Sequence, residues 1–239
     1  MYRLRIIFTI IFCTLTVTLF SYPSNSWKHV KSKHFKISYN EKTENRVKEA
    51  INIAEDIAEK IGSNFGHDIT KSRVSIVLYD HNDFTNGAAY WNEPLVKIYC
   101  RKTETLWRGE KDNLRYLLSH ELSHIYSLRI MKLRLYINFG VSTSNNPKGI
   151  NGYARTNLDI RMLPIWFMEG IAQTGSHKYG ADSRDPLREM LLRDAYLNNK
   201  LLTLSEMSRF EGTSREYELA YNQGYDLMLF MLKTIKMSN

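Results

Sequence analysis

Residues 111–130 read KDNLRYLLSHELSHIYSLRI, and this stretch carries the clearest structural signal in the chain. Its apolar residues recur at steps of three and four, the spacing of one face of an α-helix. They are Leu114, Leu117, Leu118, Leu122, Ile125 and Leu128. The sequence therefore predicts a helix that begins near Lys111 and buries this apolar stripe.

The same helix contains His120-Glu121-Leu122-Ser123-His124. Residues four apart lie one turn above each other on the same face of a helix, so the two imidazoles can bind one metal ion. Glu121 lies beside them and can take a proton from a metal-bound water. Zinc suits such a site because imidazole nitrogen and carboxylate oxygen are its usual catalytic ligands. The alternative is that both histidines are ordinary helix residues and Glu121 is a solvated acid.

A catalytic zinc site usually has three protein ligands, so a third must come from elsewhere in the chain. The best source is Trp166-Phe167-Met168-Glu169-Gly170-Ile171-Ala172, in a helix opened by Pro164. A carboxylate packed beside large apolar residues is costly to bury without a partner, and metal coordination removes that cost. We therefore expect Glu169 to be the third ligand. The alternative is an acid favoured by the dipole near the start of its helix.

Together the two motifs resemble those of the gluzincin peptidases, the group that includes thermolysin and the zinc aminopeptidases. The second motif, Pro164-Ile165-Trp166-Phe167-Met168-Glu169-Gly170-Ile171-Ala172, is similar to the Pro-x-Trp-Leu-x-Glu-Gly-x-Ala motif of an exported bacterial branch. The resemblance covers roughly residues 27–235, although only the two motifs are sharp. It implies a zincin-like domain that hydrolyses peptide bonds with a zinc-bound water. His120, His124 and Glu169 would hold the zinc, and Glu121 would activate the water.

The resemblance has further implications outside the two motifs. The segment that begins at Asn86 is similar to the one that forms the sheet edge above the zinc in this family, and Trp27–Tyr39 resembles the family's opening strand. Related enzymes place a tyrosine donor in the last helical region, which makes Tyr221 the candidate to stabilise the oxyanion. His177 is a comparable candidate. The interval between the two motifs is longer than in thermolysin, which predicts an insertion there.

The rest of the first half predicts strands and one more helix. Alternating or β-branched apolar residues predict strands at 34–39, 74–79 and 95–100. Apolar residues at helical spacing predict a helix over 47–61 that stops at Gly62, and 80–94 is rich in turn residues. We therefore expect a small mixed sheet packed on helices. The strand at 95–100 is a candidate to pair with an extended peptide at a sheet edge.

The second half is predicted to be mostly helical. Helices are expected over 164–174, 187–197 and 217–231, with a break over 175–186. Residues 138–159 are rich in Asn, Gly, Ser and Thr without a clear period, so a long loop is expected there. Strands in the first half followed by helices in the second indicate the α+β class.

The first 26 residues differ in composition from the rest of the chain. Arg3 and Arg5 precede an uncharged run, Ile6–Phe20, and a polar stretch follows. This is the layout of a secretory signal, and the run is shorter than the roughly 20 residues of a spanning helix. We therefore predict a signal peptide at 1–26, a gluzincin-like metallopeptidase domain at 27–239, and export to the periplasm, cell surface or exterior. The alternative is an uncleaved signal anchor that tethers the chain to a membrane.

Charge and cysteine content narrow the possible partners. The net charge is +8, but the Lys and Arg residues are spread along the chain and no recognition motif accompanies them, so a nucleic-acid partner is not expected. The second cysteine lies in the leader, so cleavage would leave Cys100 as a single thiol without an internal disulfide. The expected partner is a peptide or protein substrate. Two alternatives stay open: a non-catalytic zinc-binding domain that acts as a surface interaction module, and a membrane-tethered structural protein with an accidental motif.

Overall fold

The computed structural model of the chain describes residues 27–71, 73–80, 86–90, 93–100, 113–130, 136–142, 153–159, 163–180, 186–209 and 212–237. The predicted signal segment at 1–26 lies outside these ranges. Among the helices within them, none has both the length and the apolar character needed to cross a membrane.

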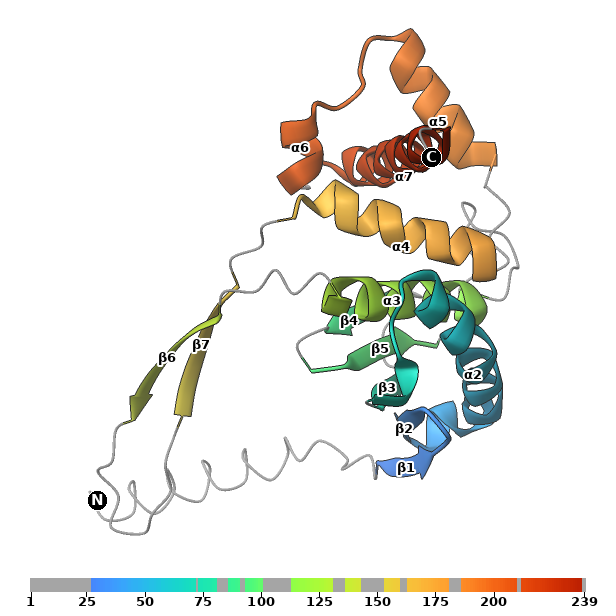
Figure 1. The fold of residues 1–239 in the computed structure, drawn as a ribbon, viewed down its shortest axis with the longest axis vertical. Helices are drawn as coiled ribbons and strands as arrows, with labels where there is room; N and C mark the ends of the chain where they lie inside the picture. Colours follow the sequence, from blue (N-terminus) through green and yellow to red (C-terminus); the bar gives the residue numbers. More distant parts are fainter. Residues whose placement is uncertain are drawn as a thin grey trace, which may run out of the picture.

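A five-stranded mixed sheet occupies the first half of the chain (Figure 1). Its order is β1-β2-β3-β5-β4; β2, β3 and β5 run parallel, and each outer strand is antiparallel to its neighbour. The strands are β1 (Lys28–Lys31), β2 (Phe35–Tyr39), β3 (Val74–Tyr79), β4 (Asn86–Tyr90) and β5 (Leu95–Tyr99). The three predicted strands are confirmed, but β5 lies inside the sheet. The expectation that it offers an edge to a peptide is wrong, because β4 covers it.

Two long helices, α2 (Val47–Asn64) and α3 (Asn113–Ile130), supply the rest of the first core, while the short helices η1 (Glu41–Arg46) and η2 (Ile69–Lys71) flank α2. Apolar side chains of the sheet, α2 and α3 form one continuous buried cluster. Its fully buried members include Phe35, Ile37, Ile57, Ile61, Ile76, Leu78, Ile98, Leu118, Leu122 and Ile125. The whole predicted apolar stripe of α3 is buried, so the prediction for this helix is confirmed.

The second half of the described chain is built from α4 (Ile165–Tyr179), α5 (Pro186–Leu197), α6 (Leu204–Arg209) and α7 (Ser214–Met237). Helix α4 packs against α3 on one side and α7 on the other (Figure 1). The helices predicted for this half are confirmed, and each is longer than predicted. Helix α6 was not predicted, because its six residues are too few to show a helical period. The chain is therefore a mixed α and β fold with its main sheet in the first half, in agreement with the predicted α+β class.

Two glycines that were expected to end helices lie inside them instead. Helix α2 continues two residues past Gly62, and α4 continues past Gly175. A Cβ atom at Gly62 would collide with the side chain of Ile69, and one at Gly175 would collide with Ser123 of α3. The glycines therefore allow close packing rather than ending helices, and the neighbour of Gly175 comes from a helix that is distant in the sequence.

The predicted loop at 138–159 is wrong at both of its ends. Strands β6 (Tyr136–Ser142) and β7 (Tyr153–Asp159) pair antiparallel along their full lengths. Figure 1 shows this hairpin apart from the main sheet. Tyr136, Ile137, Phe139 and Val141 are residues typical of strands, and the many polar residues around them hid the pattern. Pairing also satisfies the backbone polar groups that a loop would leave to water.

Candidate metal centre

Helix α3 has two buried faces with different chemistry. One face is the apolar stripe that packs into the first core, and the other presents Tyr116, His120 and His124 toward α4. These three residues follow one another at intervals of four, so they stack along one side of the helix. Both histidines are 8% exposed, and their ring centroids lie 4.9 Å apart. The local helix therefore suffices to bring the two imidazoles together.

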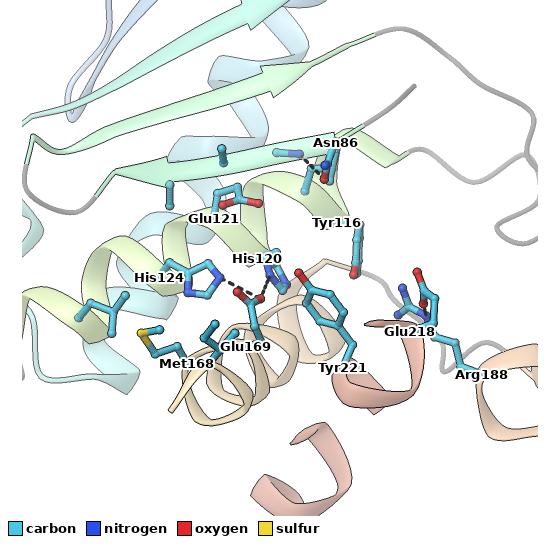
Figure 2. A pocket seen from close by; sticks show the side chains of 16 residues that line it. Asn86, Tyr116, His120, Glu121, His124, Met168, Glu169, Arg188, Glu218 and Tyr221 are labelled. Carbon is cyan, nitrogen blue, oxygen red and sulfur yellow. Dashed lines mark hydrogen bonds and ion pairs between the residues drawn. The ribbon is translucent and has the colours of Figure 1, made fainter. Parts of the chain in front are cut away.

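Glu169 reaches both imidazoles from α4, as Figure 2 shows. Its Oε2 atom lies 3.1 Å from Nε2 of His120 and 3.3 Å from Nε2 of His124. Ligand atoms of the three residues all lie within 4.8 Å of one another. Four ligands placed tetrahedrally at zinc bond lengths of about 2 Å are roughly 3.3 Å apart. The donor set and its spacing therefore fit a zinc ion.

The other ring nitrogens of the two histidines are buried. Neither Nδ1 atom has a hydrogen-bond partner among the residues that the structure describes. Metal-binding histidines usually donate this N–H to a carboxylate, carbonyl or water, which fixes the ring. Within the described residues, the packing of α3 and the shared contact with Glu169 orient the rings instead. A shift of α4 would therefore change the orientation of both imidazole rings, because Glu169 contacts both.

The charges at this cluster favour a carboxylate that stays ionised. Burial alone would raise the pKa of Glu169, but the charge of His124 and hydrogen bonds from both imidazoles hold it well below its usual range. Burial alone would lower the pKa of His124, and the Glu169 carboxylate outweighs that effect and raises it. Glu169 is thus an anion at neutral pH and can share a cation with the two rings.

Glu121 lies on the side of α3 that faces the edge strand β4. It is 5% exposed, and burial raises its pKa more than His120 and His124 lower it. A carboxylate whose pKa is raised is a stronger base than a solvated one. A Cβ atom on Gly87 of β4 would lie 2.5 Å from Oε1 of Glu121. The missing side chain at Gly87 therefore makes room for this carboxylate, and β4 is the sheet edge beside the cluster.

A cavity of about 380 Å³ opens onto these residues. Strand β4 and helices α3, α4, α5 and α7 all contribute to its wall (Figure 2). Its polar and charged lining residues are Asn86, Tyr116, His120, Glu121, His124, Glu169, Arg188, Glu218 and Tyr221. The cavity thus has room for a substrate next to the three candidate ligands.

The structure separates the two candidate donors for an oxyanion. Tyr221 of α7 lines the cavity, and its pKa is raised by burial and by the nearby carboxylates of Glu169 and Glu121, so its hydroxyl remains protonated. His177 is exposed on α4, with its ring 5.9 Å from the ring of Tyr225, and it is not part of the cavity wall. The prediction of His177 as a comparable candidate therefore loses its structural basis.

Three of the polar or charged residues that line the cavity were not predicted as site residues from the sequence. Tyr116 could have been, because it precedes His120 by one helical turn. Arg188 and Glu218 come from α5 and α7, and their local sequences contain no signal that distinguishes them from surface charges. Only the packing of these helices brings them to the cavity.

Comparison of the chain with protein-family models gives no match, and comparison with curated proteins gives no similar sequence.

Proposed function

We propose that this chain is an exported, zinc-dependent metallopeptidase of the gluzincin type, with a zincin-like catalytic domain. The observation that carries the proposal is the convergence of His120, His124 and Glu169 within 4.8 Å, in the wall of a cavity that also contains Glu121. Two imidazoles and a carboxylate are the ligand set of many catalytic zinc sites. The predicted leader at 1–26 supports export.

His120, His124 and Glu169 would hold the ion, and the remaining residues would handle protons and substrate. When bound, zinc supplies a Lewis acid that polarises a carbonyl and lowers the pKa of water. Glu121 would take the proton of the attacking water and deliver it to the leaving amine. Its raised pKa supports this role, because a stronger base accepts the proton more readily.

Tyr221 would donate a hydrogen bond to the oxygen that becomes negative as water attacks the carbonyl. A fixed donor at that position stabilises the transition state more than the ground state. Its buried hydroxyl keeps its proton, which supports the assignment. The edge strand β4 would pair with an extended peptide, the role first expected for residues 95–100.

Replacement of Glu121 by Gln tests the proposal. Gln keeps the shape of the side chain but cannot accept a proton, so peptide hydrolysis should fall by about 100- to 10,000-fold while the zinc content stays unchanged. The matched control is Glu59→Gln on the exposed surface of α2, which should change neither quantity. Hydrolysis by the Glu121 variant at the parent rate would contradict the mechanism. A parent that binds zinc but cleaves no peptide would instead favour the non-catalytic zinc-binding domain.

A further inference from the structure

The cavity has a second charged end, built around Arg188 of α5. Among the described residues that line the cavity, Arg188 is the one arginine or lysine. Its side chain is only 17% exposed, whereas arginine side chains are mostly exposed in proteins. Because little water surrounds this cation, it attracts a negatively charged group of a bound molecule more strongly than an exposed arginine would.

The guanidinium of Arg188 is held between two neighbours. Its Cζ atom lies 5.9 Å from the centre of the Tyr116 ring, and its Nε lies 3.9 Å from Oε2 of Glu218. The Tyr116 hydroxyl donates to Oε1 of Gln173 at 3.2 Å, which fixes the ring. Glu218 and the Tyr116 ring therefore hold the guanidinium at the wall of the cavity.

Tyr116 also links Arg188 to the candidate metal centre. Its ring lies 6.1 Å from the ring of His120, while Arg188 lies on its other side (Figure 2). An extended peptide advances about 3.3 Å per residue. The guanidinium therefore lies no more than about 12 Å from the centre of the His120 ring, a distance that about four residues of an extended substrate cover.

We propose that Arg188 binds a carboxylate of the substrate that lies within about four residues of the bond that is cleaved. The inference rests on the proposed hydrolase function and names its substrate class: short peptides that carry a carboxylate at this position. Arginine has five N–H donors in a planar fork and binds carboxylates with two parallel hydrogen bonds. The carboxylate is either the C-terminus of the peptide or an acidic side chain.

Peptide binding tests this proposal independently of cleavage. The protein used is the full chain that carries Glu121→Gln. Its affinity for each peptide is measured by titration calorimetry, once with zinc and once after a chelator has removed the zinc. The first pair of probes is N-acetyl-tetraalanine as the free acid and as the amide. The second pair is N-acetyl-Ala-Ala-Ala-Asp-amide and its Asn analogue, which carry the charge on a side chain instead.

Either the free acid or the Asp peptide should bind about 10- to 100-fold more tightly than its uncharged analogue. Arg188→Gln should abolish that preference. The matched control, Arg193→Gln, removes the same charge from an exposed position of the same helix and should retain it. Circular dichroism of each variant checks that the fold is kept.

Equal binding of the charged and uncharged probes by the parent, or the same preference in the Arg188 variant, would overturn the proposal. Failure to bind either probe would overturn it as well. The preference should survive removal of zinc, because Arg188 is not a candidate ligand. A protein that prefers carboxylates but neither holds zinc nor cleaves peptides would therefore refute the hydrolase function and not the carboxylate site.

Discussion

The two halves of the molecule differ in the size of their apolar cores and in the side chains that they supply to the cavity. The sheet half, formed by β1–β5, α2 and α3, contains one large continuous apolar core. In the part of the helical half, α4–α7, that the structure describes, a second and smaller buried cluster consists of Trp166, Met207 and Ala220 with partly buried neighbours. Yet the helical half supplies Glu169, Arg188 and Tyr221 to the cavity. Among the described residues, the sheet half therefore supplies most of the apolar burial, and the helical half adds several of the polar side chains that line the cavity.

Helix α3 shows why this division works. One face is part of the large core, so the opposite face holds His120 and His124 on a rigid support. Helix α4 then packs closely on both sides through glycines: Gly175 lies against Ser123 of α3, and Gly170 lies against Gly224 of α7. On these sides, the position of α4 is fixed by close contact between helices rather than by a large apolar core. The two halves should therefore respond differently to the same kind of substitution.

The largest expected effect is a loss of stability in the sheet half. Leu118 is fully buried in the large core, so Leu118→Ala should lower the free energy of unfolding by about 2–5 kcal/mol. Leu227 is partly buried beside the second cluster, so Leu227→Ala should lower the free energy of unfolding by only about 1 kcal/mol. Urea denaturation measures both values. Equal losses of stability in the two variants would contradict the proposed difference between the halves.

Added methyl groups should separate stability from metal binding. A Cβ atom on Gly170 would lie 2.7 Å from the carbonyl oxygen of Gly224, so Gly170→Ala should push α4 away from α7 and cost about 1–3 kcal/mol. Because Glu169 is the neighbouring residue, zinc affinity should fall too. Gly62→Ala in the sheet half should destabilise the fold without changing zinc affinity. Calorimetric zinc titration distinguishes these outcomes, and an equal effect of both variants on zinc would argue against the comparison.

A smaller change is expected where the sheet touches the candidate centre. Gly87→Ala should displace the Glu121 carboxylate and reduce kcat about ten-fold, because a catalytic base must lie in hydrogen-bonding reach of its proton. The zinc content should not change, since Glu121 is not a candidate ligand. Full activity of this variant would show that the carboxylate does not need the space left by the glycine.

The smallest expected effect depends on pH and is confined to the sheet half. Oε1 of Glu55 accepts a hydrogen bond from the backbone N–H of His34 at 2.9 Å. Burial would raise the pKa of Glu55, but hydrogen bonds from Ser32 and His34 outweigh it and lower the pKa. A lowered folded-state pKa stabilises the fold above the unfolded value of about 4.3, and this stability is lost as pH falls through the folded value.

Glu55→Gln should therefore cost about 0.5–1 kcal/mol at neutral pH, and the difference from the parent should shrink below about pH 4. Thermal unfolding measured across pH checks this. A difference that stays constant down to pH 3 would mean that the carboxylate charge is not what links β2 to α2.

The sequence predicted what local periodicity encodes. The apolar stripe of α3, the strands β2, β3 and β5, and the helical positions of His120 and His124 follow from spacing alone. The roles of Gly175 and Arg188 do not, because they depend on residues that are distant in the sequence. The hairpin of β6 and β7 was missed because its alternation is short and lies among polar residues. Long-range packing is thus the part that local patterns cannot supply.

Zinc analysis of three purified proteins tests the central claim most directly. The parent should contain one zinc per chain. Glu169→Ala should lose most of it, because two imidazoles alone hold the ion weakly. Glu218→Ala, which removes another acid from the same cavity but not from the candidate ligands, should keep one zinc per chain. A parent without zinc, or a Glu169 variant with the zinc content of the parent, would contradict the account.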